Sequence, residues 1–205
     1  MNRRKDSFYH KAKNAGFRSR ASFKLLEIQE KFELLQEGDL VLEIGSSPGG
    51  WTQIIREITG ETVVSVDVEK MEPIPGIIFI KSNVFNRELE GKLKEILAEL
   101  GRDHFDAILS DAMVKTSGDR NIDHSSSYLL CRRVMELADE FLEQDGKAIV
   151  KQFQGDMTEE FFREWARKYR FKKKTTPKAS RSGSSELYMI FAGKRKGRIT
   201  HSQKA

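Results

Sequence analysis

The sequence predicts an α/β fold, built on a Rossmann-like, mostly parallel sheet of seven strands. Short apolar runs alternate with longer amphipathic segments along the chain, and a glycine-rich turn follows the first of these runs. Strands that alternate with helices form parallel sheets covered on both faces. The last two runs are joined by a polar loop without a helix, so we expect the final strand to pair in the antiparallel direction.

The individual elements follow from apolar periodicity and from turn residues. Apolar and β-branched runs predict strands at residues 40–45, 62–68, 77–81, 105–110, 147–153, 171–176 and 186–192. Amphipathic stretches predict helices at residues 19–35, 50–58, 88–100, 125–142 and 158–169. We expect a turn at residues 144–146 and an N-cap at Thr158. A basic arm (1–17) and a basic tail (194–205) flank the predicted domain (18–193).

Composition limits the class of protein. The chain has 205 residues, enough for one domain with a sizeable core, and its single cysteine, Cys131, forms no internal disulfide. We therefore expect a reducing, cytoplasmic location. No apolar run is long enough to span a bilayer, and the basic start lacks the apolar stretch of a signal peptide. The four histidines are scattered, so no metal site is expected.

Positive charge is concentrated at the two ends of the chain. Residues 1–24 hold eight Lys or Arg against one acid, and residues 163–205 hold fourteen against two, although the whole chain carries only +5. Aromatic residues such as Phe17 and Phe171 lie among these cations. Cations that meet phosphates, beside rings that can stack on bases, favour nucleic-acid contact over two merely solvated tails.

The glycine-rich turn at residues 45–50 predicts a ligand site. It lacks the Gly-Lys-Ser/Thr of a P-loop and the GxGxxG spacing of dinucleotide binders. The acidic Glu43 beside it suits a cationic or amino-bearing ligand, such as S-adenosylmethionine (SAM), better than a pyrophosphate. The candidate cofactor-binding residues here are Glu43, Gly45, Ser46, Pro48, Gly49, Gly50 and Trp51.

Four further polar residues end other predicted strands. They are Asp67, Asn83, Asp111 and Lys151. Ligands of such sheets bind outside the carboxyl ends of the strands, so we expect these side chains to meet the glycine turn. Asp67 suits ribose hydroxyls; Asn83 suits either an adenine edge or a simple turn. Lys151, inside an apolar strand, must reach solvent or meet a carboxylate.

Several motifs together resemble the FtsJ/RrmJ family of SAM-dependent RNA ribose 2′-O-methyltransferases. They are Ser-Arg-Ala-Ser-Phe-Lys-Leu (19–25), Gly-Ser-Ser-Pro-Gly-Gly-Trp (45–51), Ser-Asp (110–111), Thr-Ser-Gly (116–118), Asp-His (123–124), Val-Lys-Gln-Phe-Gln-Gly (150–155) and Ser-Arg-Ser-Gly-Ser-Ser-Glu-Leu-Tyr (180–188). They cover residues 18 to 193 in the family's order and spacing. The chain departs from the family pattern at Asn83 and after Asp111.

The resemblance implies a seven-stranded methyltransferase sheet and a catalytic tetrad of Lys24, Asp111, Lys151 and Glu186. It also implies SAM contacts at Gly45, Gly50, Trp51, Asp67 and Asn83, with Asp111 near the methyl donor. Without this resemblance, two structural salt bridges would account for the same four charged residues.

The expected reaction is methylation of a ribose 2′-oxygen in RNA by a monomeric enzyme. The resemblance points to a uridine of large-subunit (23S) ribosomal RNA, free or within the assembled subunit, and transfer RNA remains an alternative substrate. The target atom excludes DNA, which lacks a 2′-hydroxyl. A non-catalytic RNA-binding module and a SAM enzyme for small molecules are further alternatives, and a nicotinamide-dependent oxidoreductase fits the loop spacing less well.

Overall fold

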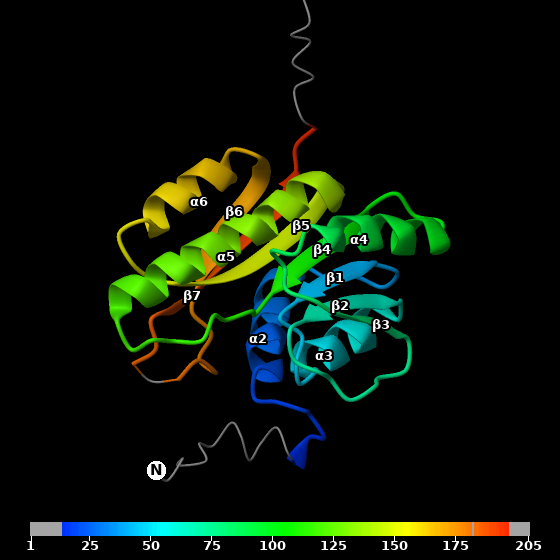
Figure 1. The fold of residues 1–205 in the computed structure, drawn as a ribbon, viewed down its shortest axis with the longest axis horizontal. Coiled ribbons are helices and arrows are strands. Elements are labelled where there is room, and N and C mark those ends of the chain that lie inside the picture. The colour runs from blue at the N-terminus through cyan, green and yellow to red at the C-terminus, as the bar shows by residue number, and fades with distance from the viewer. Residues whose placement is uncertain (1–13, 182, 197–205) are drawn as a thin grey trace, which may run out of the picture.

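The computed structural model describes residues 14–181 and 183–196 and contains one seven-stranded sheet (Figure 1). Its strand order is β3-β2-β1-β4-β5-β7-β6. The strands are β1 (Val41–Ile44), β2 (Val63–Asp67), β3 (Ile77–Lys81), β4 (Phe105–Ser110), β5 (Leu142–Phe153), β6 (Tyr169–Thr175) and β7 (Glu186–Lys194). Along this order, each neighbouring pair from β3 through β2, β1 and β4 to β5 is parallel, whereas β7 runs antiparallel to both β5 and β6. The predicted fold class is confirmed.

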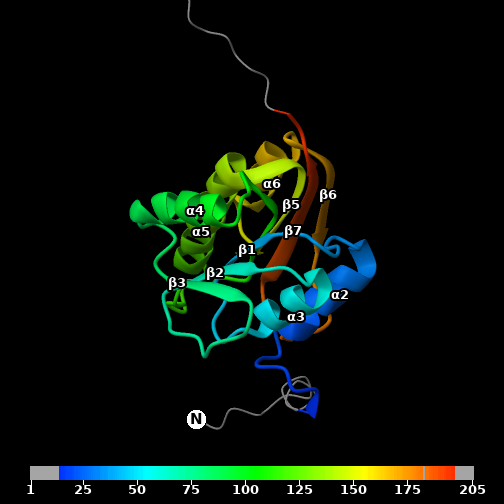
Figure 2. The same ribbon diagram turned by 90° about the vertical axis from the view of Figure 1, so that its right-hand side faces the viewer.

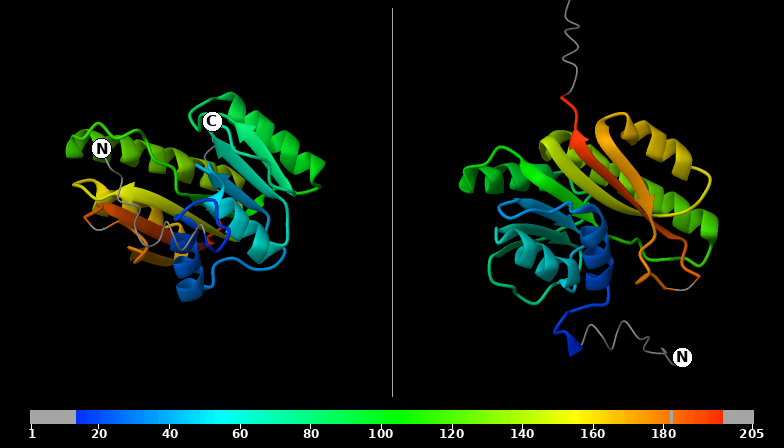
Figure 3. Two further views of the ribbon diagram at one scale, coloured as in Figure 1. Left: turned by 90° about the horizontal axis from the view of Figure 1, so that it is seen from below. Right: turned by 180° about the vertical axis from the view of Figure 1, so that it is seen from behind.

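Helices cover both faces of the sheet, as the views from the side and from below show (Figures 2 and 3). They are α2 (Ser22–Phe32), α3 (Gly50–Thr59), α4 (Glu88–Glu99), α5 (Arg120–Phe141) and α6 (Thr158–Ala166). One apolar core joins the sheet to α4, α5 and α6, and a second joins it to α2 and α3. None of the helices in the described part of the chain is long and apolar enough to cross a membrane.

The parallel arrangement brings the ends of β1, β2, β3, β4 and β5 to one edge of the sheet. Because β7 is antiparallel to β5, its first residue, Glu186, lies at this same edge, opposite Phe153 at the end of β5. The register also places Tyr188 opposite Lys151. Strand direction therefore brings residues far apart in sequence to one place.

Two predicted boundaries differ around α5. The helix begins at Arg120 rather than near residue 125, because the Asp119 side chain caps it by accepting hydrogen bonds from the Asn121 and Ile122 amides at 2.8 and 3.2 Å. Strand β5 begins at Leu142, so the predicted turn at residues 144–146 was wrong. The polar triplet is instead an irregularity inside β5, with Asp145 at a φ of 67°.

The N-cap prediction for Thr158 was also wrong. Met157 occupies the cap position, Thr158 is the first helical residue, and its hydroxyl accepts a hydrogen bond from the Gly155 amide at 2.9 Å. Strand β7 continues to Lys194, whose ammonium donates to the Ala138, Asp139 and Leu142 carbonyls at the end of α5. Most of the predicted arm (residues 1–13) and tail (residues 197–205) lies outside the described residues.

Candidate functional site

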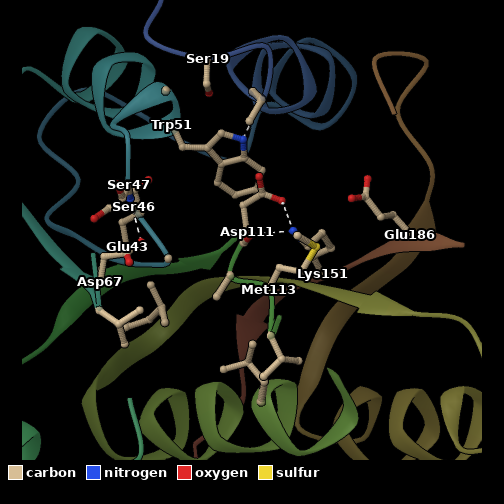
Figure 4. A pocket seen from close by; sticks show the side chains of 18 of the residues that line it. Ser19, Glu43, Ser46, Ser47, Trp51, Asp67, Asp111, Met113, Lys151 and Glu186 are labelled. Atoms are coloured by element: carbon tan, nitrogen blue, oxygen red, sulfur yellow. Dashed lines mark hydrogen bonds and ion pairs between the residues drawn. The ribbon is translucent and has the colours of Figure 1, made fainter. Parts of the chain in front are cut away.

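A cavity of about 970 Å³ opens at the carboxyl ends of the parallel strands (Figure 4). Glu43 and Asp67 lie on one side of it, Lys151 and Glu186 on the other, and Asp111 between them. Its lining includes every predicted site residue except Gly49: Lys24, Glu43, Gly45, Ser46, Pro48, Gly50, Trp51, Asp67, Asn83, Asp111, Lys151 and Glu186. The residues expected at the strand ends and those implied by the family motifs thus line the same cavity.

The glycine turn owes its shape to close approach. Gly45 has a φ of 81°, and a Cβ there would lie 2.4 Å from the Cα of Ala112, so only glycine lets the ends of β1 and β4 come this near. A Cβ on Gly50 would lie 2.0 Å from Ser19 Oγ. Gly49 does not line the cavity; it caps α3 at a φ of 104°, against the Met71 and Ile74 side chains.

Two carboxylates beside the turn have different environments. Glu43 is 1% exposed and accepts hydrogen bonds from Thr52 Oγ1 at 2.5 Å and Ser65 Oγ at 3.1 Å. Burial, aided by the nearby charges of Asp111 and Asp67, raises the Glu43 pKa to about 7, although the two hydroxyl donors oppose this shift. The second carboxylate, Asp67, accepts the Ser47 and Glu69 amides, both at 2.8 Å, and so orders the turn.

Other parts of the wall combine structural contacts with free polar atoms. Asn83 Oδ1 accepts the Phe85 amide at 3.0 Å, which is the turn role that the sequence left open, while the residue still lines the cavity. Trp51 donates from Nε1 to the Ala21 carbonyl at 2.8 Å. Ser46 Oγ is buried in the wall without a hydrogen-bond partner among the described residues. A buried hydroxyl of this kind is available to a ligand or to a water molecule.

Lys151 and Asp111 form the centre of the half of the cavity that lies away from Glu43 and Asp67. Lys151 Nζ lies 3.0 Å from Asp111 Oδ1 and donates to the Asp111 carbonyl oxygen at 2.6 Å. The carbonyl oxygen of Lys151 accepts a hydrogen bond from the buried Cys131 Sγ at 2.9 Å. Burial of Asp111 opposes its ionisation, but the positive charges of Lys151 and Lys24 prevail and lower its pKa. The buried lysine of β5 therefore does meet a carboxylate.

Lys24 and Glu186 form the second pair, with Nζ and Oε2 2.8 Å apart. Both side chains are mostly buried, at 8% and 14% exposure. The Lys24 ammonium also donates to the Tyr188 hydroxyl at 3.0 Å, and this hydroxyl donates to Asp111 Oδ1 at 2.5 Å. The two ion pairs are thus one connected network.

Tyr188 is the member that the sequence reasoning missed. It is fully buried, its ring stacks on Trp51 at a centroid distance of 5.9 Å, and burial together with Asp111 and Glu186 raises its pKa well above the usual value. One signal was present, because residues two apart in a strand face the same way and Tyr188 follows Glu186 by two. A tyrosine within an apolar strand nevertheless looks like ordinary core.

Comparisons with known proteins agree on one family. The sequence model of the FtsJ-like methyltransferases matches residues 17–194. The protein named "Ribosomal RNA large subunit methyltransferase E" from Picrophilus torridus is 47% identical, over 92% of this chain and 97% of its own length. The protein of the same name from Thermoplasma acidophilum is 46% identical, over 92% of each.

A solved structure agrees with these relatives. A Plasmodium falciparum protein, provisionally named a ribosomal RNA methyltransferase, superposes with a TM-score of 0.78 at 29% identity. The match covers 87% of this chain and 98% of that one.

Proposed function

The chain belongs to the FtsJ-like methyltransferase family, and on this premise we propose that it transfers a methyl group from SAM to a ribose 2′-oxygen in RNA. One observation carries the proposal: the connected network of Lys24, Asp111, Lys151 and Glu186 opens into the same cavity as the glycine turn. A nucleophile and a methyl donor held in one cavity need little beyond alignment and removal of a proton.

The proposed substrate is large-subunit ribosomal RNA. The relatives that cover almost the whole chain carry this RNA in their names. We further propose a uridine as the target nucleotide, as the resemblance of the motifs implies. Transfer RNA is the alternative that the experiment below distinguishes.

The residues of the glycine-turn half suit SAM. Glu43 and Asp67 offer carboxylate oxygens, Ser46 a buried free hydroxyl, and Gly45 and Gly50 allow close approach by the backbone. The bound cofactor would supply an electrophilic methyl group on a sulfonium. We propose that Asp67 receives ribose hydroxyls through its acceptor oxygens, and that Glu43 and the turn receive the amino-bearing end, whose positive charge favours the ionised form of Glu43.

The proposed roles in the tetrad follow from its contacts. Lys151 orients the attacking 2′-hydroxyl and takes up its proton when the amine is neutral. Asp111, ionised and in contact with Lys151 at 3.0 Å, holds this amine in place. Lys24 and Glu186, paired at 2.8 Å, position the ribose.

Exposed cations at the C-terminal end of the domain suit an RNA backbone. Lys172 and Lys173 on β6, and Lys178 and Arg181 in the loop before β7, are exposed, and Arg181 also lines the cavity. We propose that they contact phosphates, so RNA affinity should fall steeply as salt rises. A flat salt response would count against this surface.

Methyl transfer from labelled SAM tests the proposal. The acceptors are large ribosomal subunits, free ribosomal RNA and transfer RNA, each from cells that lack this protein. A 2′-O-methylated linkage resists alkali because the hydroxyl that cleaves it is blocked, so the label should appear in alkali-stable dinucleotides from the large subunit. Label in transfer RNA would change the substrate only. Label in the mononucleotides that alkali releases would place the methyl group elsewhere than on a ribose 2′-oxygen and would overturn the proposed target. Absence of label, with SAM bound, would favour a non-catalytic RNA-binding module.

A further inference from the structure

A second cavity, of about 540 Å³, lies beside the tetrad. It shares four lining residues with the first cavity, namely Thr116, Phe153, Gly183 and Ser184, so the two are neighbours that have part of their wall in common. It lies at the end of β5 and the start of β7, whereas the glycine turn, Asp67 and Asn83 follow β1, β2 and β3. Asp111, Lys151 and Glu186 of the tetrad belong to the same ends of β4, β5 and β7, so the second cavity adjoins the tetrad rather than the cofactor half.

The wall of the second cavity is shaped in advance by hydrogen bonds. The Asp123 carboxylate accepts from the Ser117 amide at 2.6 Å, from Ser117 Oγ at 2.9 Å and from the Gly118 amide at 3.3 Å. These bonds fold the loop before α5 onto the first turn of that helix. The Asp123 charge is consequently engaged by the protein itself rather than left to meet a ligand.

His124 ties this loop to the end of β5. Its Nδ1 lies 2.8 Å from the Phe153 carbonyl oxygen, and its Nε2 accepts the Met157 amide at 3.2 Å. A Cβ on Gly155 would lie 2.3 Å from the His124 ring, so the glycine permits this close packing. Motifs with no part in the tetrad, at residues 116–118, 123–124 and 153–155, thus build one wall.

Two polar side chains at this cavity are uncommitted. Arg120, the first residue of α5, and Gln154, just past β5, are both exposed and line the cavity. Within residues 14–181 and 183–196, neither side chain has a hydrogen bond or an ion pair. A guanidinium is suited to phosphate, and an amide can pair with the edge of a base. The half-buried Phe153 adds an aromatic surface.

We propose that the second cavity receives the nucleotide next to the target ribose in a single-stranded RNA. This inference rests on the proposed function, because the nucleotide next to a ribose held at Lys151 needs a neighbouring space, and the second cavity shares part of its wall with the first. The volume falls within the roughly 300–1,000 Å³ of small-molecule sites. Arg120 binds the phosphate, and Gln154 reads the edge of the base.

The test compares two variants with matched controls. Gln154→Ala is paired with Gln144→Ala, an exposed glutamine at the opposite end of β5, and Arg120→Ala with Arg167→Ala, an exposed arginine just past α6. The probe is a twelve-nucleotide single strand around the mapped methylation site. A second version carries an abasic ribose beside the target nucleotide.

We expect Arg120→Ala and Gln154→Ala each to raise the KM for the intact probe by roughly three- to tenfold, as for one lost contact. Replacing the intact probe by the abasic probe should raise the KM of the wild type by a similar factor and leave the KM of Gln154→Ala almost unchanged. A plot of log affinity against log salt has a negative slope, and Arg120→Ala should make this slope shallower by about 0.7 because one phosphate contact is lost. Controls should match the wild type.

Two results would overturn the inference while the proposed function stands. One is methyl transfer that neither variant alters relative to its control; the other is an equal abasic penalty in the wild type and Gln154→Ala. If the wild type transfers no methyl group to any RNA, the proposed function fails separately. Dissociation constants for a uridine dodecamer, intact or with one abasic ribose, then decide the second cavity by the same comparison.

Discussion

The hydroxyl of Tyr188 donates a hydrogen bond to Asp111 Oδ1 at 2.5 Å, and the same hydroxyl accepts one from Lys24 at 3.0 Å. This single oxygen joins the two ion pairs of the site. It also explains how two lysines and two carboxylates stay ordered in a mostly buried cluster, where an unsatisfied polar group is costly.

Tyr188→Phe should therefore slow methyl transfer without disturbing the fold. The ring still stacks on Trp51, but Lys24 and Asp111 lose their link. We expect kcat to fall roughly tenfold, in line with loss of a hydrogen bond to a charged group, and the dissociation constant for SAM to stay unchanged. The control is Tyr169→Phe, because the buried Tyr169 hydroxyl has no partner among the described residues. Equal kcat values for the two variants would contradict this role.

Gly45→Ala tests the close approach of β1 and β4. The substitution combines an unfavourable φ of 81° with a Cβ only 2.4 Å from the Ala112 Cα. Gly60→Ala serves as control, since Gly60 has a φ of 66° and an added Cβ would meet nothing within 4 Å. We expect about 1–2 kcal/mol of destabilisation for Gly60→Ala and about 1–3 kcal/mol more for Gly45→Ala, together with loss of SAM binding. Urea unfolding and calorimetric titration measure both. Equal stabilities would refute the packing argument.

Glu43 should make stability depend on pH. Its folded-state pKa of about 7 exceeds the ordinary value of 4.5, so between these two values the native state holds a proton that the unfolded state has released. The free energy of unfolding should consequently decrease from about pH 4.5 to pH 7, by about 3 kcal/mol at most. Glu43→Gln keeps an acceptor for Thr52 and Ser65 but does not titrate.

Urea unfolding of both proteins at pH 5 and pH 8 checks this effect. The variant should gain stability relative to the wild type at pH 8 and lose that advantage at pH 5. A difference between the two proteins that stays constant with pH would show that Glu43 ionises normally.

The fold was largely predictable because apolar runs and glycine turns carry its information locally. The meeting of Asp111 and Lys151 was predictable because strand ends meet at one edge in a parallel sheet. Lys24 and Glu186 needed the family motifs, since nothing local distinguishes Lys24 from a surface lysine on α2. Their pairing arises from the antiparallel direction of β7.

The errors came from residues whose local preference was overridden by their surroundings. The triplet at residues 144–146 is typical of a turn, yet the residues on either side of it, Leu142 and Lys147, both pair with β4 and so keep it inside β5. Asp119 capped a helix that began earlier than its apolar pattern indicated. Tyr188 and the second cavity depend on contacts between segments up to 164 residues apart, which a linear pattern does not record.

The central claim is that Lys151 acts on the ribose hydroxyl, and the most direct measurement is the single-turnover rate of methyl transfer to large-subunit RNA by Lys151→Ala. Its control is Lys147→Ala on the same strand. Lys147 Nζ lies 2.8 Å from Asp39 Oδ2, and neither residue lines the cavity. With SAM affinity measured in the same preparations, we predict a rate at least about 100-fold below wild type for Lys151→Ala and a near-normal rate for the control. A folded, SAM-binding Lys151→Ala protein that methylates at the wild-type rate would contradict the account.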